Sequence, residues 1–317
     1  NWNVATLVLR GRADPAKLLT KDEAQRRILL NCPTHRQRKI AMSLRRRVQA
    51  NSTFRRLAKG VHNALPFGLR RLTFTLWNTD ILGRARYAGV YKSFDAFPNP
   101  SYPPIDTETV RASLAAMKRD DASGLMIFRH DHAMLPVVAA MLGGRDLRVL
   151  DFGGAAGLDY VGLRAAVGGI AHYCVVELPE ICQVARDAWA ARTDGDHLVF
   201  REDMPPTSER FDIVYAWSAI HYVRQPLELL ASFAAYQPRA ILLVYHAITR
   251  ELHGFVRGQR GEHYVCPQHV LSLRDIERAL PGYRLAFRGS GDFEMNVDNF
   301  PPGCRVGRCA NLLFLPT

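Results

Sequence analysis

The sequence predicts an α/β fold built on an open, largely parallel β-sheet, and three observations carry this prediction. From residue 147 onward, short apolar runs alternate with stretches of helical spacing. Runs such as "FDIVYAW" and "AILLVYHA" are apolar throughout, as in strands that are buried on both faces. A glycine-rich stretch, "LDFGGAAGLDY", overlaps the end of the first of these strands. Sheets of this kind bind ligands at the carboxyl ends of their strands, so we expect a ligand site there.

The individual elements follow in chain order. Residues 77–105 are aromatic-rich and hold several prolines, which exclude a long helix and favour loop and turns. The helical patterns cover 107–119, 131–142, 157–168, 179–193, 225–236 and 272–280. The strand patterns cover 147–152, 172–177, 197–200, 211–216, 240–246, 283–289 and 309–315. Because no long helix separates the last two strands, we expect them to form an antiparallel hairpin at one edge of the sheet.

The basic charge of the chain is concentrated near its beginning. Residues 1–71 hold 17 Lys and Arg against 3 acidic residues, whereas residues 72–317 hold 25 against 27. We therefore divide the chain into a basic arm, a helical and loop cap region and a ligand-binding domain. The expected ranges of these three parts are 1–75, 76–145 and 146–317, and Met42 offers an alternative start that would make residues 1–41 non-native.

Residues 42–70 of the arm show the pattern of short basic amphipathic helices. Such helices suit peripheral contact with an anionic membrane, binding to nucleic acid, or packing of their apolar side on the main domain. Nucleic acid is the least favoured of the three, because aromatic residues are not interleaved with the basic ones and no RNA-binding motif is present.

The composition of the sequence indicates the cellular compartment of the protein. The sequence has no run of about 18 apolar residues that would predict a transmembrane helix, and its first residues lack the features of a signal peptide. The 6 cysteines form no C-x-x-C pair, which favours free thiols in a reducing compartment. We therefore expect a cytoplasmic protein, membrane-peripheral if the arm binds lipid, with no metal site.

The glycine turn departs from the dinucleotide-binding pattern. In a G-x-G-x-x-G reading, Phe152 occupies the place of the first glycine, and Gly154 and Gly157 follow. An acid such as Asp151 before the turn repels a pyrophosphate but suits a ligand with a cationic amino group. S-adenosylmethionine (SAM) has an ammonium and a sulfonium group and no phosphate. Gly153 completes the set of glycines that let the backbone approach such a ligand closely.

Acidic side chains also follow the next two strands. Glu177 ends the second strand, where a carboxylate can accept hydrogen bonds from ribose hydroxyls, and Asp203 follows the third, where it would meet an adenine amino group. In the alternative, structural reading, Glu177 caps the next helix and Asp203 begins a turn. Ser218 lies at the end of the fourth strand, at the mouth of the site. The cofactor-binding candidates are therefore Asp151, Gly153, Gly154, Gly157, Glu177, Asp203 and Ser218.

Two histidines are candidates for a general base. His221 follows the fourth strand and His246 ends the fifth, and an imidazole has an unperturbed pKa near 6.5, which suits proton removal from an acceptor. Each histidine also fits a purely structural role. The Gly-rich segment 254–267 reads either as a lid over the site or as an ordinary surface loop. The side chains that would line an acceptor wall, or pack in a core, are Tyr87, Tyr91, Phe94, Phe128 and His130.

Four stretches together resemble the motifs of class I SAM-dependent methyltransferases, namely "VLDFGGAAG", "VVELPE", "REDMP" and "FDIVYAWSAIHYV". With "YAGVYKSFDAF" and "GQRGEHYVCP", residues 65–317 are also similar to a bacterial family of methyltransferases associated with surface polysaccharide gene clusters. The resemblance implies a Rossmann-like sheet of seven strands with an antiparallel C-terminal edge hairpin. It also implies SAM as the cofactor and O-methylation of a saccharide or related small-molecule acceptor.

The chain departs from the family pattern at Ala155 and Ala156, where such turns usually have glycine at one or both positions. A methyl group there would crowd the methionine part of SAM and weaken its binding. An NAD-dependent oxidoreductase is a second candidate, although the missing first glycine disfavours it. A third is a non-catalytic protein of the methyltransferase fold that acts through its arm. "AWSA" stands where nucleic-acid amino-methyltransferases have an Asn-Pro-Pro-Tyr type motif, so a nucleic-acid base is a disfavoured acceptor.

Overall fold

The computed structural model describes residues 86–102, 107–108, 110–111, 113, 133–167, 169–190, 192, 195–261, 264–295 and 297–317. These residues fall in one of the two compact units of the chain, the unit that holds Ala85–Thr317. The predicted basic arm, with its amphipathic segment 42–70, lies outside the described residues, as do most of the predicted helix at 107–119 and the wall candidates Phe128 and His130.

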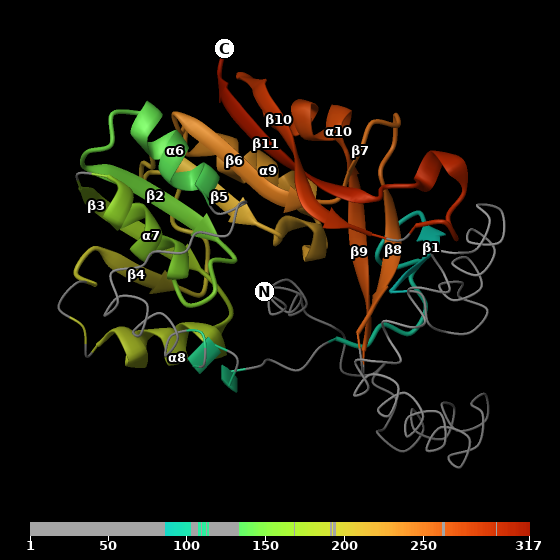
Figure 1. The fold of residues 1–317 in the computed structure, drawn as a ribbon, viewed down its shortest axis with the longest axis horizontal. Helices are drawn as coiled ribbons and strands as arrows, with labels where there is room; N and C mark the ends of the chain where they lie inside the picture. Colours follow the sequence, from blue (N-terminus) through green and yellow to red (C-terminus); the bar gives the residue numbers. More distant parts are fainter. Residues whose placement is uncertain are drawn as a thin grey trace, which may run out of the picture. The chain divides into compact units, whose positions relative to one another are not determined.

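A seven-stranded sheet with the order β10-β11-β6-β5-β2-β3-β4 forms the core of the fold (Figure 1). Five strands are parallel to one another: β2 (Leu147–Phe152), β3 (Ile170–Val176), β4 (Leu198–Arg201), β5 (Ile213–Trp217) and β6 (Ala240–His246). β2 is the middle one of the five parallel strands. The chain continues on one side of β2 with β3 and β4, and then crosses to the other side with β5 and β6. Open α/β sheets bind ligands at such a reversal, so the expected ligand site lies at the carboxyl ends of β2 and β5.

The last two strands close one edge of this sheet. β11 (Arg308–Pro316) pairs antiparallel with β6 on one side and with β10 (Tyr283–Glu294) on the other. The sheet of seven strands and its antiparallel C-terminal edge hairpin are therefore confirmed. The predicted strand at 283–289 is extended to Glu294, because the pairing with β11 continues beyond a register shift after Ser290.

Helices cover both faces of the seven-stranded sheet. One face carries α6 (Met134–Met141), α7 (Leu158–Ala166) and α8 (Pro179–Trp189), and the other carries α9 (Pro226–Ala235) and α10 (Leu273–Ala279) (Figure 1). Because both faces are covered, the central strands are apolar throughout, and that continuous apolar run is the pattern on which they were predicted. Prolines stand at the first helical positions of α8 and α9, where a missing N–H does no harm. No helix in the described part of the chain is long and apolar enough to cross a membrane.

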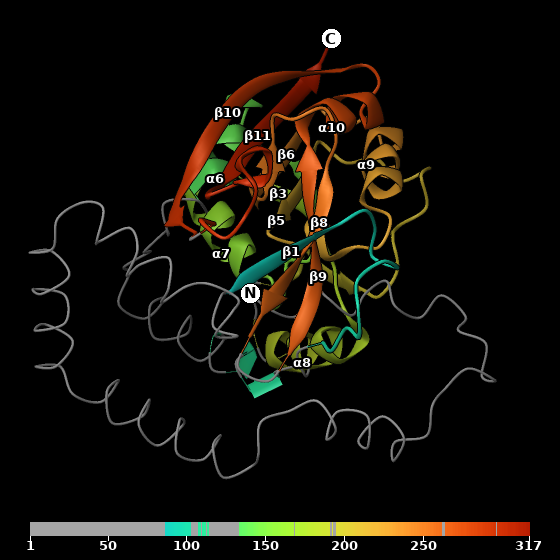
Figure 2. The same cartoon turned by 90° about the vertical axis from the view of Figure 1, so that its right-hand side faces the viewer.

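A second sheet, of order β1-β8-β9-β7, contradicts two expectations from the sequence. It consists of β1 (Tyr87–Tyr91), β8 (Phe255–Arg260), β9 (Val265–Ser272) and the short β7 (Ile248–Thr249). The segment predicted as loop and turns at 77–105 thus contains a strand, and the lid or surface loop predicted at 254–267 consists largely of two paired strands. β7 directly follows β6, so this sheet stands beyond the carboxyl end of β6 (Figure 2).

The second sheet escaped prediction because one of its faces is both buried and polar. Arg257, Gln259 and Gln268 are buried on β8 and β9, at positions where an ordinary strand pattern has apolar residues. Gly258 lies on the opposite face against the Phe97 ring, and a Cβ there would come within 2.9 Å of that ring. The glycine that suggested a mobile loop therefore provides space for an aromatic side chain instead.

Candidate active site

The glycine turn after β2 is a tight link between that strand and α7. Gly153 and Gly157 have φ angles of 74° and 73°, in the left-handed region that favours glycine. The N–H of Gly153 donates to the carbonyl of Val176 at 2.9 Å, which ties the turn to the neighbouring strand β3. Gly157 is the N-cap residue, immediately before α7. The turn thus lies at the carboxyl ends of β2 and β3, at the expected ligand site.

Asp151 is fully buried directly beneath this turn. Its Oδ2 accepts a hydrogen bond from the Tyr173 hydroxyl at 2.8 Å, whereas Oδ1 has no partner in the described structure. A Cβ on Gly154 would come within 2.2 Å of Oδ2, so the carboxyl group requires glycine at this position. Burial, reinforced by the charge of Asp159, raises the pKa of Asp151 well above its usual range. A cationic ligand group near Oδ1 would satisfy that atom and favour the ionised form, which fits SAM.

Glu177, at the end of β3, holds the turn from the other side. Its carboxylate accepts hydrogen bonds from the N–H of Ala155 at 3.1 Å and from the N–H of Leu178 at 2.9 Å. The side chain is fully buried, and burial raises its pKa to about 7 against the opposing effect of these two hydrogen bonds. Leu178 is the N-cap residue before α8, and no side-chain capping hydrogen bond is found among the described residues at the start of that helix.

Asp203 and Ser218 complete the series of strand ends. Asp203 is exposed in the turn that follows β4, and Ser218 is half-buried immediately after β5. Ser218 has a φ of 52°, an uncommon conformation for a residue with a side chain. Its N–H donates to the carbonyl of Val244 at 2.8 Å, which fixes this bend against β6. The cofactor-binding candidates from the sequence therefore lie at the carboxyl ends of four neighbouring strands, β2, β3, β4 and β5.

The two alanines of the turn occupy different environments. Ala155 has a φ of 49°, so its side chain tolerates a left-handed conformation that costs an L-residue roughly 1–2 kcal/mol. Ala156 is buried in the core beneath the turn, where the Trp189 indole donates to its carbonyl at 2.9 Å. The Ala156 methyl group therefore packs against the core. The crowding of the ligand expected from this alanine is not what the structure shows.

Substituting each alanine with glycine is expected to change stability in opposite directions. Ala155→Gly should raise the free energy of unfolding by roughly 0.5–1 kcal/mol, because relief of the left-handed strain exceeds the entropic cost of glycine. Ala156→Gly should lower it by about 1 kcal/mol, because a buried methyl group is lost. Urea unfolding measures both values, provided that the dependence of the unfolding free energy on urea concentration is the same in the variants and in wild type. Effects of the same sign in the two variants would contradict this description of the turn.

His246, the last residue of β6, is buried and serves the backbone. Its Nε2 accepts hydrogen bonds from the N–H groups of Ala219 and Ile220, at 3.3 and 3.2 Å. Burial lowers its pKa to about 3, so the imidazole is neutral at physiological pH and carries its proton on Nδ1. With its acceptor nitrogen already used, His246 has no lone pair for an acceptor proton. The geometry favours its structural reading, as the anchor of the 3₁₀ turn Ile220–Tyr222.

A pH titration of stability would check the role of His246. In the unfolded chain its pKa is near 6.5, so protonation below that pH favours unfolding until the folded pKa is reached. His246→Gln, whose side-chain oxygen can take the place of Nε2, removes this titration. Between pH 7 and pH 5, wild type should lose about 2 kcal/mol relative to the variant. Wild type is compared with the variant, and not followed alone, because Glu177 has a raised pKa and its protonation stabilises the folded state as the pH falls. If the stability difference between wild type and His246→Gln did not change between pH 7 and pH 5, this role of His246 would be contradicted. His197→Gln, at an exposed histidine, serves as the control.

His221 lies in the 3₁₀ turn that His246 anchors, with the two ring centroids 5.2 Å apart. It is buried, and neither ring nitrogen has a hydrogen-bond partner among the residues that the structure describes. Burial, followed by the nearby His246 and Arg257, lowers its pKa well below the usual value. A buried polar group without partners is costly and requires a reason. A ligand that binds beside His221 would provide this reason, because a neutral imidazole retains a lone pair that can accept a proton.

Beside His221 lies a cluster that the sequence did not reveal, which we term the inner polar cluster: Tyr222, Arg257, Gln259 and Gln268. The Tyr222 hydroxyl donates to Gln259 Oε1 at 2.7 Å, and Gln268 Nε2 donates to the same oxygen at 3.0 Å. Arg257 Nε in turn donates to Gln268 Oε1 at 2.8 Å. All four side chains are buried. The only signal in the sequence is the spacing of two between Arg257 and Gln259 in "FVRGQR" on β8, which places both on one face of a strand.

The wall candidates from the sequence are engaged in aromatic packing. Tyr91 packs edge-on against Phe97 at a centroid distance of 5.0 Å, and Phe94 stacks on His269 at 4.4 Å. Tyr87 is different, because its ring lies 4.1 Å from the Arg257 guanidinium. Of the wall residues that the structure describes, Tyr87 therefore contacts the inner polar cluster.

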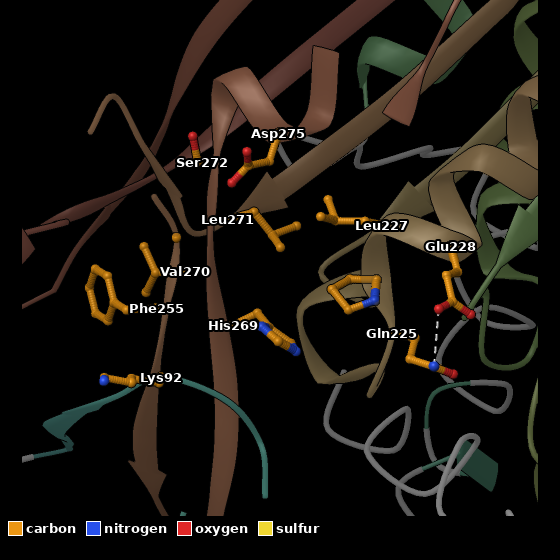
Figure 3. Close-up of a pocket in the computed structure, with 12 residues that line it drawn as sticks. Lys92, Gln225, Leu227, Glu228, Phe255, His269, Val270, Leu271, Ser272 and Asp275 are labelled. Atoms are coloured by element: carbon orange, nitrogen blue, oxygen red, sulfur yellow. Dashed lines mark hydrogen bonds between the residues drawn. The ribbon is translucent and has the colours of Figure 1, made fainter. Parts of the chain in front are cut away.

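A pocket of about 320 Å³ opens between the second sheet and the beginnings of α9 and α10 (Figure 3). It is lined by Lys92 and His269 together with the acids Glu228 and Asp275, and Glu228 accepts a hydrogen bond from Gln225 at 3.0 Å. None of the cofactor candidates or candidate bases lines this pocket. We therefore place the active site at the strand ends, where the glycine turn and His221 lie, and not in this pocket.

Comparisons with known proteins indicate the class of domain that this fold represents. Residues 127–283 match the family model of a methyltransferase domain. None of the curated proteins compared matches the sequence significantly. The solved structures that resemble the chain include magnesium protoporphyrin IX methyltransferase from Synechocystis PCC 6803 with bound SAM (13% identity, 67% of this chain and 79% of that chain, TM-score 0.37).

Two further structures show similar values. One is a SAM-dependent methyltransferase from Clostridium acetobutylicum ATCC 824 (10% identity, 65% of this chain and 98% of that chain, TM-score 0.43). The other is the N-terminal domain of EvdMO1 in the presence of SAH, the demethylated cofactor, and D-fucose (16% identity, 61% and 85%, TM-score 0.43). Resemblances at this level of sequence identity do not identify the substrate of the present chain.

The family match and the strand order define the class of the protein. The chain is a methyltransferase on a Rossmann-like fold, and its cofactor is SAM. The alternative of an NAD-dependent oxidoreductase is therefore disfavoured by the family match as well as by the missing first glycine.

Proposed function

We propose that the enzyme transfers the methyl group of SAM to a hydroxyl oxygen of a small polar acceptor, a saccharide or a related molecule, with His221 as the general base. The observation that carries this proposal is the state of His221. It is a neutral, buried imidazole, and neither of its nitrogens has a partner among the described residues. It follows β5, the strand adjacent to the β2 strand that bears the glycine turn.

The cofactor would lie across the glycine turn. Asp151 would pair with the amino group through Oδ1, Glu177 would accept from the ribose hydroxyls, and Asp203 would meet the adenine amino group. The backbone of the turn supplies a close approach at Gly153, Gly154 and Gly157, and Ser218 stands at the mouth. SAM supplies an activated methyl group when bound in this position.

The protein's own contribution to the chemistry is alignment and proton removal. A methyl transfer is a displacement at carbon, so the acceptor oxygen must be held in line with the transferred group. His221 would take the hydroxyl proton as that oxygen becomes alkylated, and its depressed pKa keeps it unprotonated before the reaction. Burial excludes water, which would otherwise compete with the acceptor.

The chemistry of the inner polar cluster supports a hydroxyl-rich acceptor. Two amide side chains, Gln259 and Gln268, and the Tyr222 hydroxyl offer donors and acceptors in a buried setting beside His221. Sites that hydrogen-bond substrate hydroxyls discriminate strongly against analogues that lack them, because the buried polar groups are then left unpaired. Saccharides present such hydroxyls on several sides.

A product assay tests the proposed function. The purified full chain is incubated with SAM that carries a deuterated methyl group and with a panel of neutral and anionic sugars, and products are analysed by mass spectrometry. The expected result is a deuterated methyl ether on one class of sugar together with release of SAH. Transfer to a nitrogen or carbon atom, or failure of the wild-type protein to bind SAM in calorimetry, would contradict the proposal.

A further inference from the structure

We propose that Arg257 is an anion-recognition residue of the acceptor site, and that the acceptor therefore carries a carboxylate or a phosphate group beside the hydroxyl that is methylated. This inference rests on the proposed function for the location of the acceptor. It concerns a residue of β8, on the second sheet, for which the sequence alone suggested no role in binding.

The first argument is the poor pairing of the Arg257 cation. Its side chain is fully buried, yet its contacts in the described structure include no carboxylate. Of its donors, Nε is well paired with Gln268, one terminal nitrogen reaches the Val306 carbonyl only at 3.4 Å, and the other contacts the Met295 sulfur at 3.2 Å. A thioether is a weak acceptor. Among the residues that the structure describes, this buried guanidinium therefore has no counter-ion.

The Tyr87 ring compensates for the missing anion only in part. The guanidinium carbon lies 4.1 Å from the ring centroid, a favourable cation–π distance. This contact covers one face of the guanidinium plane, whereas the N–H groups at its edge remain directed at Met295 and Val306. Those in-plane N–H groups are the ones that bind a carboxylate or phosphate in a two-point arrangement. An anion would replace two weak contacts with two strong ones.

The second argument is the continuity between Arg257 and the candidate base. Arg257 contacts Gln268, Gln268 contacts Gln259, and Gln259 accepts from the Tyr222 hydroxyl. The Tyr222 ring packs edge-on against His221, with centroids 4.3 Å apart. One acceptor molecule would therefore meet the base and the cation within a single buried site.

The chemistry thus narrows the acceptor class from polar small molecules to acidic ones, such as a sugar acid or a sugar phosphate. The anionic group would be fixed by Arg257, and a neighbouring hydroxyl would be presented to His221. A purely structural Arg257 is the competing explanation. It predicts that the residue supports folding through Tyr87 and Gln268 and has no affinity for added anions.

Thermal unfolding in the presence of small probes separates these explanations. The full chain, saturated with SAH, is titrated with acetate or inorganic phosphate, and with chloride and the uncharged isostere acetamide at matched ionic strength. The wild-type melting temperature should rise by about 3 °C or more once the anion exceeds its Kd tenfold, and acetamide should have no such effect. The anion that acts at the lower concentration indicates whether the acceptor carries a carboxylate or a phosphate.

The variants assign that effect to one residue. In Arg257→Met the anion-dependent rise should disappear, while the matched variant Arg284→Met, at an exposed position of β10, should keep it. Arg257→Lys keeps the charge without the two-point geometry and should need about tenfold more anion. If Arg257→Met fails to fold, the lysine variant and the wild-type comparison of acetate with acetamide decide the question.

Two outcomes of the unfolding experiment would overturn the inference. One is an equal anion effect in wild type and in Arg257→Met or Arg257→Lys. The other is a wild-type protein in which neither acetate nor phosphate acts more strongly than acetamide and chloride. Failure of the proposed function is recognised separately, by calorimetry of SAH and by the product assay. An enzyme that binds SAH and methylates only neutral sugars would retain its proposed function and lose this inference.

Discussion

His221→Ala is expected to lower kcat by roughly 10²–10⁴-fold, the usual contribution of a general base. The physical reason is that, of the two candidate bases, His221 keeps a free lone pair, whereas His246 spends its acceptor nitrogen on two backbone N–H groups. Turnover is measured as SAH released with an acceptor that the wild-type enzyme methylates. The affinity for SAH should change little, because His221 lies outside the cofactor-binding set.

The pH profile separates a catalytic from a structural role of His221. Since burial holds its pKa well below 6.5, wild-type kcat/KM for the acceptor, measured with saturating SAM, should not fall as the pH is lowered through 6.5, and the acid limb should appear only at lower pH. That limb should be absent from the residual activity of His221→Ala. The exposed His197→Ala is the matched control and should keep full turnover. Full turnover of His221→Ala would remove His221 from the mechanism.

Glu177→Ala is expected to weaken SAM binding by roughly 100-fold or more. Its carboxylate makes two hydrogen bonds to backbone N–H groups, and hydrogen bonds to a charged group each contribute about 1.5–3 kcal/mol. The substitution frees the Ala155 N–H in a turn that already contains strained backbone, and it also removes the predicted acceptor for the ribose hydroxyls. Isothermal calorimetry with SAM measures the loss of affinity.

The control for this variant is Glu180→Ala, at an exposed acid in the first turn of α8. It should leave the affinity unchanged. In wild type, affinity should also decline as the pH falls through about 7, because a protonated Glu177 is a poorer acceptor. Equal SAM affinities for wild type and Glu177→Ala would remove Glu177 from the cofactor site.

Most of the seven-stranded sheet could be predicted because its physics is visible in the sequence. The strands β5 and β6 are buried on both faces and are therefore apolar throughout, and Pro179 and Pro226 mark helix starts. The acids Asp151 and Glu177 were found for a similar reason, since each directly ends or follows an apolar run. Strand-end positions in a parallel sheet converge in space whatever the intervening sequence.

The second sheet could not be predicted in the same way, because its inner face is polar. The second sheet also depends on β1, which pairs with β8 from more than a hundred residues earlier in the chain, and no local pattern encodes that contact. The sequence was likewise unable to separate His221 from His246, since both follow apolar strands. Only the hydrogen bonds of His246 Nε2 show which of the two imidazoles keeps a free acceptor.

The position of β11 also has a consequence for biosynthesis. β11 lies between β6 and β10, so the long apolar edge of β6 stays unpaired until residues 308–316 have left the ribosome. Roughly 70 residues separate the ends of β6 and β11, which corresponds to about 4–14 s of translation. During that interval the nascent chain exposes a flat apolar edge, the kind of surface on which chains associate wrongly. The enzyme's core is therefore completed late in synthesis, and its yield in cells should depend on chaperones that protect unpaired strands.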